Sequence, residues 1–522
     1  MMPRHPSKTV LILLGCLGAL GSWSKTAAVA EPAQAAVTSP AASQGRYIVR
    51  LHGAAARSVT TEAEIAAAHG VAVAHSYRTL FAGFAGTMSP GAAQALRRHP
   101  LVASVEADVA VSLDTVPATA AVLQEGSAPW GLDRIDQRAL PLDQAYTFRR
   151  TGAGVRAYVV DTGILASHLD FEGRVEPGHT VIDDGLGSSD CNGHGTHVAG
   201  TIGGRRWGVA KGVTLVPVRV LGCSGSGMLS GVIAGLDWVA SQGPTPSVVN
   251  LSLSTSRSEA FNATVAALVA RGITVVAAAG NADTDACSRS PASEPGVLTV
   301  AASTAADTRA PFSNHGPCVA LYAPGVAVTS AWPTAPDAAV ALSGTSMAAP
   351  HTAGVAALAL EANPLATPAD IKRYIAQSAT PQAVDQGAIG PAAPLLYALA
   401  PGAPQPWSVA VTALAPLPPE ALADGRVRAR LSAQVQAYDG ERWTDGVAGA
   451  QVSGVFSPGG PASCTTDAAG QCVLNRCATA LDAQPGSFTV LSVRAEGLVG
   501  NVALGVGSIT DTWPAIAVAA GR

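Results

Sequence analysis

The sequence predicts an α/β protein with a doubly wound, mainly parallel sheet, a small α/β domain before it and an all-β sandwich domain after it. Two apolar runs, VRAYVVD (155–161) and ITVVAAA (273–279), have the composition of parallel strands that are buried on both faces. Strand-like and helix-like segments alternate around these runs, as they do in doubly wound folds. After residue 407 the runs become short and alternating, which is typical of a β sandwich.

Changes of composition divide the chain into four expected parts. A basic start, an apolar stretch over 10–20 and the small residues Ala28-Val29-Ala30 predict an export signal over residues 1–30. Residues 31–122 are expected to form a leading segment that is folded over about 46–114, where RYIVRLHG alternates like a strand. A large domain follows over 123–402, and a Pro-rich stretch separates it from the expected sandwich domain, 403–522.

Composition and the first residues also limit the setting in which the protein acts. The formal net charge is −4, charged residues make up 13% of the chain, and no long basic run occurs, which argues against a nucleic-acid partner. The export signal predicts a secreted protein, which we expect to be a monomer without a transmembrane anchor. Because Leu13-Leu14-Gly15-Cys16 also matches a lipoprotein cleavage box, lipid anchoring through Cys16 is an alternative.

Three polar residues stand in contexts that suit a nucleophilic hydrolase. Asp161 ends a buried strand, where open α/β sheets place their sites, and His194 lies in NGHGTHVAG, 192–200. Ser346 follows a Gly-Thr turn at the start of a helix, where unpaired N–H groups can face a developing oxyanion. In such a triad, His194 would take the proton of Ser346 and Asp161 would orient the imidazole. The chain order Asp, His, Ser is one of the known orders of this triad.

In the blocks AYVVDTGI, NGHGTHVAG and GTSMAAPHTA, the chain resembles the subtilases, and among them the proteinase K and aqualysin branch. The resemblance runs from about Trp130 to Leu399 and implies a serine endopeptidase that is made as a zymogen. It implies that residues 31–122 are a propeptide, which assists folding and then inhibits the active site. It also implies that the side-chain amide of Asn281 donates to the oxyanion, although an asparagine that stabilises a turn is the alternative.

The same resemblance implies a substrate cleft between two edge segments, GCSGSGMLSG (222–231) and NLSLST (250–255). Such edges pair with the backbone of an extended peptide, so that many sequences can bind. Small, uncharged residues after the second buried run are expected to line the primary pocket and to favour an apolar side chain. Ser254 stands where relatives usually carry glycine, which leaves the detailed preference open. The expected substrate-binding residues are Gly225, Ser226, Gly227, Ser252, Leu253, Ser254, Ala278, Ala279 and Gly280.

Cysteines and acidic residues predict structural cross-links and a metal site. The resemblance implies the disulfides Cys191–Cys223 and Cys287–Cys318, and the hairpin-like spacing of Cys464 and Cys472 fits a third, with Cys477 unassigned. We expect no cofactor in catalysis, but structural Ca²⁺ is expected at a loop that resembles a calcium site of relatives. Helix caps and surface charges are the alternative there. The expected calcium ligands are Asp133, Asp136, Gln137 and Asp143.

A second calcium site of the family would use carbonyl groups at Pro295 and Val297 together with an aspartate. Ala320 stands at the position of that aspartate, so the resemblance predicts that this second site is weak or absent.

The sequence therefore predicts a secreted serine endopeptidase of broad specificity that acts on protein or peptide substrates and is inhibited by its own propeptide. A processing peptidase with few substrates is one alternative, and a non-catalytic binding protein is another. The intact set of Asp161, His194, Asn281 and Ser346 argues against the second. For maturation, we expect Ser346 to cut after Leu123 or an immediate neighbour, leaving an N-terminus between Thr119 and Glu125. Removal by another protease is the alternative.

Overall fold

The structure is a computed structural model. It describes residues 44–52, 59–113, 116–117, 127–243, 245–399, 408–422, 427–438, 443–457, 460–476, 486–495, 499–500 and 508–511. The expected export signal with Cys16, the segment 118–126 with Leu123, and Cys477 lie outside the described residues.

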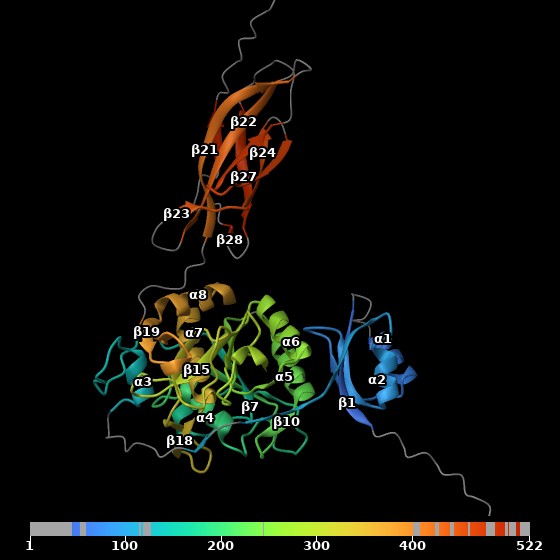
Figure 1. The fold of residues 1–522 in the computed structure, drawn as a ribbon, viewed down its shortest axis with the longest axis vertical. Coiled ribbons are helices and arrows are strands. Elements are labelled where there is room, and N and C mark those ends of the chain that lie inside the picture. The colour runs from blue at the N-terminus through green and yellow to red at the C-terminus, as the bar shows by residue number, and fades with distance from the viewer. Residues whose placement is uncertain are drawn as a thin grey trace, which may run out of the picture. The chain divides into compact units, whose positions relative to one another are not determined.

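The largest sheet has nine strands, and its neighbouring strands are parallel except at the edge pair β19·β20. The strand order is β19-β20-β16-β15-β13-β11-β7-β9-β8, in which non-consecutive neighbours are joined by crossovers. This arrangement confirms the predicted doubly wound, mainly parallel sheet (Figure 1). The strands are β7 (Arg156–Asp161), β8 (His179–Thr180), β9 (Thr214–Arg219), β11 (Ser247–Leu251), β13 (Thr274–Ala278), β15 (Leu298–Ser303), β16 (Leu321–Pro324), β19 (Thr380–Val384) and β20 (Ala393–Leu395).

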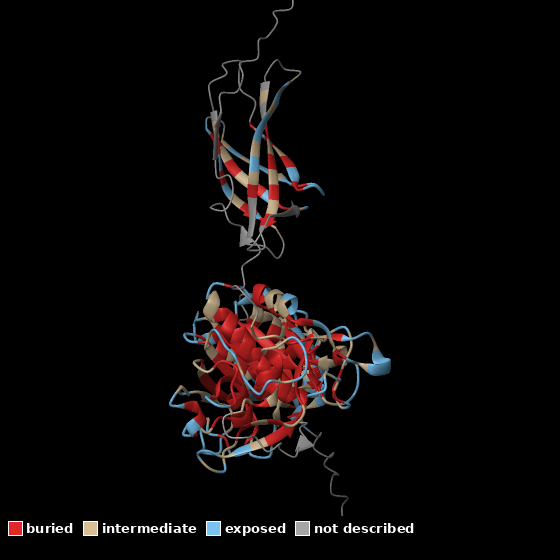
Figure 2. Ribbon diagram, turned by 90° about the vertical axis from the view of Figure 1, so that its left-hand side faces the viewer, coloured by how far each residue is buried: buried red, intermediate tan, exposed pale blue. Residues whose placement is uncertain are grey.

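Helices cover both faces of this sheet because successive strand residues point to opposite sides. Val159 and Val276 enter one hydrophobic core, whereas Val160 and Val275 enter the other. The first core also holds residues of α4 (His194–Gly203) and α7 (Thr345–Ala362), and the second holds residues of α5 (Leu229–Ser241) and α6 (Glu259–Ala270). Figure 2 shows the buried residues concentrated in these layers. The remaining α-helices in the described part of the large domain are α3 (Trp130–Ile135) and α8 (Pro368–Ser378).

The leading domain is a four-stranded antiparallel sheet in the order β2-β3-β1-β4 (Figure 1). Apolar residues of its strands and helices, including Val49, Phe84 and Leu96, share one core. This agrees with the predicted small α/β domain. Its elements are β1 (Gly45–Leu51), α1 (Val59–Ala68), β2 (Ala72–Tyr77), β3 (Gly83–Met88), α2 (Pro90–Leu96) and β4 (Val102–Ala107).

Carboxylates connect the leading domain to the large domain by capping helices. Glu106 accepts hydrogen bonds from Ala260 N (2.7 Å) and Ser258 Oγ (2.8 Å) at the N-terminus of α6. Asp108 accepts from Ser230 N (2.9 Å) and Ser230 Oγ (2.7 Å) at the N-terminus of α5. A negative charge at a helix N-terminus satisfies unpaired N–H groups and interacts favourably with the helix dipole. The two carboxylates therefore hold the leading domain against α6 and α5, respectively.

The C-terminal domain consists of two sheets that share one core, as predicted for a sandwich, and their strand pairs are antiparallel except for β21·β28. Leu431 and Val435 of the first sheet and Phe456 and Phe488 of the second lie in this core. The first sheet contains β21 (Ser408–Ala421), β22 (Val427–Tyr438), β23 (Trp443–Gly446), β26 (Gln471–Asn475) and β28 (Val499–Gly500). The second contains β24 (Gln451–Ser457), β25 (Gly460–Thr465), β27 (Gly486–Arg494) and β29 (Ser508–Asp511).

Candidate active site

The structure brings Asp161 and His194 together in the interior. Asp161 ends β7 and is 0% exposed, and His194 begins α4 and is 2% exposed. His194 Nδ1 lies 2.8 Å from Asp161 Oδ1 and 2.9 Å from Oδ2. Because an ionised carboxylate only accepts hydrogen bonds, Nδ1 carries the proton and Nε2 keeps its lone pair. Within the described residues, this buried Nε2 has no hydrogen-bond partner, so it is available to accept a proton.

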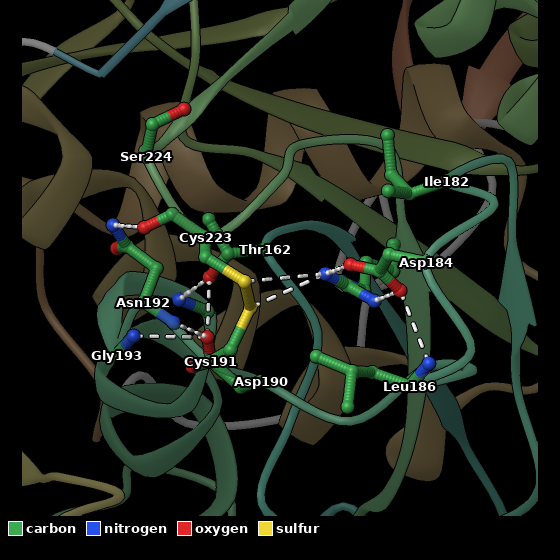
Figure 3. Close-up of a disulfide and its surroundings, with 12 residues drawn as sticks. Thr162, Ile182, Asp184, Leu186, Asp190, Cys191, Asn192, Gly193, Cys223 and Ser224 are labelled. Atoms are coloured by element: carbon green, nitrogen blue, oxygen red, sulfur yellow. Dashed lines mark hydrogen bonds and ion pairs between the residues drawn. A yellow bond between two sulfur atoms is a disulfide. The ribbon is translucent and has the colours of Figure 1, made fainter.

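Asp190, which was not predicted from the sequence, holds the loop that places His194. Its Oδ1 accepts hydrogen bonds from Thr162 Oγ1, Asn192 N and Gly193 N, each at 2.9 Å (Figure 3). Its Oδ2 accepts from the N (2.9 Å) and the Oγ1 (2.6 Å) of Thr196 in α4. Asp190 thus ties the end of β7 to the start of α4. No local pattern marks Asp190 in the sequence, because its partners Thr162 and Thr196 lie on segments that only the fold brings together.

Ser346 is the second residue of α7, and a proline in that helix shapes its surroundings. Pro350 has no N–H, so it cannot donate to the carbonyl of Ser346 four residues earlier. That carbonyl accepts instead from Ser252 Oγ at 2.8 Å, while Ser346 Oγ donates to the carbonyl of Ser252 at 3.1 Å. The two serines therefore fix each other, and Ser252 lies directly beside the proposed nucleophile.

Asn281 follows β13 and faces the start of α7. Its Oδ1 accepts from the N and the Oγ1 of Thr345, both at 2.8 Å, which fixes the orientation of the side-chain amide. Gly280, just before it, has φ +102°, and a Cβ there would lie 2.4 Å from Asn314 Nδ2. A side chain at 280 would be strained and would collide, so the glycine permits the turn that presents Asn281.

A small cavity joins most of the expected substrate-binding residues to Ser346. Ala278 and Gly280 form part of its wall, but the side chain of Ala279 packs in a separate cluster with Tyr322 and Leu395. The side chain of Ala279 therefore does not line the cavity, because it points away from the side to which Ala278 and Gly280 belong. The cavity is lined by Ser112, Ser252, Leu253, Ser254, Ala278, Gly280, Asn281, Thr345 and Ser346.

Ser112 of the leading segment reaches this cavity as part of a strand. β5 (Ala110–Ser112) pairs antiparallel with β10 (Ser226–Met228), and Ser112 also forms an antiparallel bridge with Ser254. Leu113 N donates to the carbonyl of Gly225 at 3.1 Å. The segment 118–126, which would have to enter the cleft for a cut after Leu123, lies outside the described residues, and Ala110–Ser112 is the described segment that pairs with both edges. The alternating run VAVSL (109–113) suits this position, because alternating β-branched residues pair readily with exposed strand edges.

Two other buried histidines of the large domain, His197 and His351, have structural roles. His197 Nε2–H donates to the carbonyls of Val328 (3.0 Å) and Val340 (3.1 Å), which joins α4 to two neighbouring strands. Burial, and then the nearby His194, lower the pKa of His197 to about 3. Burial likewise lowers the pKa of His351 to about 4. Both rings are therefore neutral at physiological pH, and the contacts of His197 give it a packing role.

Disulfides join Cys191 to Cys223, Cys287 to Cys318 and Cys464 to Cys472, with Cα–Cα distances of 5.0, 5.3 and 5.8 Å. The first lies beside the Asp190 loop, and Asn192 Nδ2 donates to the carbonyl of Cys223 at 3.0 Å (Figure 3). Asp184 also approaches these sulfurs, but its carboxylate is bound by Arg219. With the thiols in a disulfide and the carboxylate paired, this group is not a metal site.

The expected calcium ligands lie in and after α3, and their acidic groups cap the backbone. Asp133 accepts from the N–H groups of Asp143 (3.2 Å) and Gln144 (2.6 Å), and Asp136 accepts from Thr147 N (2.5 Å). Burial, followed by the charges of Asp143 and Asp133, raises the pKa of Asp136 to about 6.

The donor set suits Ca²⁺, because carboxylates and amides supply hard oxygen ligands and a cation would relieve the crowding of negative charge. The positions of these oxygen atoms fit a bound ion less well. No three acidic oxygens of Asp133, Asp136 and Asp143 lie within 4.8 Å of one another in the described part of the chain. Gln137 meanwhile donates through Nε2 to the carbonyls of Ala139 and Pro141. A bound ion would therefore require the loop to tighten around it.

At the second calcium position considered, a lysine of this chain supplies the positive charge. Lys372 Nζ donates to the carbonyl of Pro295 at 2.6 Å and to that of Val297 at 2.9 Å. These are the two carbonyls that the family site would use, and both already bind an ammonium group. Burial lowers the pKa of Lys372, and nearby Glu294 opposes that shift.

The fold and this arrangement define the class of protein: a serine protease of the subtilisin type. Residues 152–392 match the model of the subtilase family, and residues 33–114 match that of the peptidase inhibitor I9 family. The chain belongs to the subtilase family, and it carries an I9 propeptide domain before the protease domain.

Similar proteins have names that agree with this class. An extracellular serine proteinase of Thermus sp. (strain Rt41A) is 53% identical over 55% of this chain and 68% of its own length. An alkaline serine protease of Corniculantispora psalliotae is 40% identical over 66% of this chain and 88% of its own. The crystal structure of a cold-adapted subtilisin-like serine proteinase is 49% identical, with a TM-score of 0.51, covering 53% of this chain and 100% of that one.

Proposed function

We propose that the protein is a secreted serine endopeptidase in which Asp161, His194 and Ser346 form the catalytic triad. The observation that carries this proposal is the buried His194, held through Nδ1 by Asp161 with its Nε2 lone pair available. His194 takes the proton of Ser346 Oγ as that oxygen attacks the peptide carbonyl, and then gives it to the leaving amine. Water then attacks the acyl-enzyme carbonyl while His194 takes its proton, and His194 returns that proton to Ser346 Oγ as the acid product leaves.

The oxyanion is stabilised by the side-chain amide of Asn281 and by the backbone N–H of Ser346 at the start of α7. Support comes from the fixed amide, whose Oδ1 is bound to Thr345 so that its NH₂ end is directed elsewhere. Both donors are positioned before the reaction, so they stabilise the developing charge with little rearrangement.

Replacement of Asn281 by alanine is expected to lower kcat by about 10²–10³-fold with little change in KM, since the oxyanion exists only after attack. Steady-state hydrolysis of a chromogenic peptide measures both constants. Asn281→Asp keeps the oxygen that accepts from Thr345 but lacks the amide donor, so it should be similarly slow. Wild-type turnover in both variants would remove Asn281 from the oxyanion site.

The cleft is expected to bind extended peptides mainly through their backbone and to prefer an apolar side chain before the cut bond. Both edges, β10 and the segment Ser252–Ser254, offer backbone groups for pairing, as their contacts with β5 illustrate. The cavity wall at Ala278 and Gly280 carries no charge. A processing peptidase with few substrates is the second candidate, and cleavage of a diverse peptide library distinguishes the two.

Secretion and zymogen formation follow from the domain organisation that we propose: signal 1–30, propeptide 31–122, protease 123–402 and sandwich 403–522. Relatives are named extracellular or alkaline serine proteases, which supports export. No helix in the described ranges has the length and apolar character to cross a membrane. Capping of α5 and α6 by Asp108 and Glu106 supports an inhibitory propeptide that also stabilises the protease.

We further propose that the loop of Asp133, Asp136, Gln137 and Asp143 binds Ca²⁺. Saturating Ca²⁺ is expected to raise the Tm of the mature enzyme by about 5–10 °C over EDTA, as for a ligand at roughly 100 times its Kd. Asp136→Asn should lose most of this shift, whereas Asp283→Asn, a control at an exposed ion pair with Arg309, should keep it. Equal Tm in Ca²⁺ and EDTA for the wild type would contradict the site.

A further inference from the structure

Lysine is rare in this chain, and the described residues place it where a compact cation binds backbone carbonyls. Of the 32 lysines and arginines, four are lysines, and two of these, Lys211 and Lys372, lie in the described ranges. Lys372 Nζ donates to the carbonyls of Pro295 and Val297, and Lys211 Nζ likewise donates to two nearby carbonyls. An ammonium group is a compact point charge with three donors, whereas the guanidinium of arginine is a planar fork. Both described lysines therefore act as small cations on which two carbonyl oxygens converge.

The turn before β15 holds the two carbonyls that bind Lys372. Val297 N donates to the carbonyl of Glu294 at 3.0 Å, which closes this turn. Val297 is 1% exposed and packs in one of the two cores beside the sheet. Lys372 comes from the first half of α8, and its neighbour Ile371 is buried in the other core. The ammonium group therefore joins two segments that are each anchored in a core, so its position is fixed by the fold.

We infer that the carbonyls of Pro295 and Val297 form a cation site that the ammonium group of Lys372 occupies, so that this protein needs no calcium there. The resemblance to the subtilases implies Ca²⁺ at this position, and the residues of this chain do not fit it. Ala320 provides no carboxylate, although its N–H donates to the carbonyl of Thr299, two residues beyond Val297, at 2.9 Å. Both carbonyls of the site already accept from Lys372, whose charge also repels a second cation. The inference does not depend on the proposed catalytic mechanism.

Removal of the Lys372 side chain should turn this position into a site for a free cation. Lys372→Ala leaves the carbonyls of Pro295 and Val297 directed at one point without a donor, which is unfavourable because Val297 is buried. Ammonium ion has the charge and the N–H donors of the missing group. Tetramethylammonium has the same charge but is larger and has no N–H, so it cannot form these hydrogen bonds. Lys372→Met keeps the site blocked, because its apolar side chain fills most of the same space.

The test is thermal unfolding of the full chain in EDTA, with Ser346→Ala as the parent of every variant so that self-digestion does not contribute. Lys372→Ala is expected to lower the Tm by about 3–6 °C, because two charge-assisted hydrogen bonds are lost. Ammonium chloride at about 0.5 M should recover about half of this loss, beyond its effect on the parent, whereas tetramethylammonium chloride should recover none. Lys372→Met should lose stability and recover it with neither salt. Hydrogen exchange in α8 should follow the same pattern, which locates the effect at this helix.

Arg156→Ala is the matched control, because it removes a cation whose partner is a carboxylate and not a pair of carbonyls. Arg156 Nε lies 2.9 Å from Glu176 Oε2. The Tm of this variant should respond to the two salts as the Tm of the parent does.

A second measurement replaces the missing carboxylate and titrates Ca²⁺ without EDTA. Ala320→Asp combined with Lys372→Ala should show a Ca²⁺-dependent rise in Tm that exceeds that of the parent by about 3 °C or more. Ala320→Asp alone should show only the response of the parent, because the ammonium group still fills the site.

The inference is overturned if Lys372→Ala unfolds at the Tm of the parent with unchanged exchange in α8, or if both salts recover the lost stability equally. A Ca²⁺ response of Ala320→Asp alone that equals the response of the double variant would also overturn it, because a metal ion would then bind while Lys372 is in place.

Discussion

Replacement of Ser346 by alanine is expected to abolish peptide hydrolysis, with kcat lower by roughly 10⁶-fold, the size of the effect known for the serine of subtilisin. The reason is that, in the proposed mechanism, Ser346 Oγ is the atom that attacks the peptide carbonyl, and alanine has no hydroxyl to replace it. The variant should fold, because alanine is tolerated at the start of a buried helix and the carbonyl bond from Ser252 Oγ remains possible.

Two measurements check this expectation. Fixed-time hydrolysis assays give kcat. A Tm of the variant equal to that of the wild type shows that the loss of activity is not caused by unfolding. Ser346→Ala should also remain joined to its propeptide when it is purified without other proteases. Turnover within tenfold of the wild type, or clean processing of the variant, would contradict the assignment of Ser346 as nucleophile.

Replacement of Asp161 by asparagine should lower kcat by about 10⁴-fold while leaving the fold intact. An amide can donate to His194 Nδ1, which would move the ring proton to Nε2 and leave that nitrogen without the lone pair that the proposed mechanism requires. Thr162 N donates to Asp161 Oδ1 at 2.8 Å, and the amide oxygen of asparagine can still accept that bond. The expected loss is therefore in the chemistry and not in the position of the loop.

Hydrolysis rates of Asp161→Asn and of the control Asp283→Asn test this expectation. Asp283 is half-exposed and pairs with Arg309 at 2.7 Å, so its replacement removes a carboxylate outside the cavity lining. The control should retain wild-type kcat. An equally small effect of both substitutions would show that Asp161 does not orient His194.

Much of the fold was predictable because its signals are local. The buried run ending at Asp161 identified a parallel strand, and the alternation of apolar faces around Val159 and Val160 explains why helices cover both sides. The change to short alternating runs after residue 407 identified the sandwich for the same reason. Such patterns report burial directly, so one sequence is sufficient.

Other features depend on contacts between distant segments and were not predictable in this way. Asp190 acts through Thr162 and Thr196, and its role becomes visible only when β7 and α4 are adjacent. Ala279 was expected in the pocket wall, but strand alternation sends its side chain to another cluster. Lys372 reaches the carbonyls of Pro295 and Val297 from a helix more than 70 residues away in the chain.

The segment in the cleft shows the same limit. The composition of Ala110–Ser112, which is small and mostly apolar, does not reveal its partners. These appear only in the register, in which Ser112 pairs with both Ser226 and Ser254. Pairing partners on other strands are properties of the fold and are not encoded in the segment itself.

The most direct test of the central claim is mass spectrometry of the active enzyme after reaction with a sulfonyl fluoride. This reagent captures a serine that is activated as a nucleophile, so the attached mass reports which serine His194 activates. A single adduct on the peptide that contains Ser346, formed in parallel with the loss of hydrolysis, is the predicted result. Complete inactivation with the adduct on another residue, or full activity with Ser346 labelled, would contradict the account.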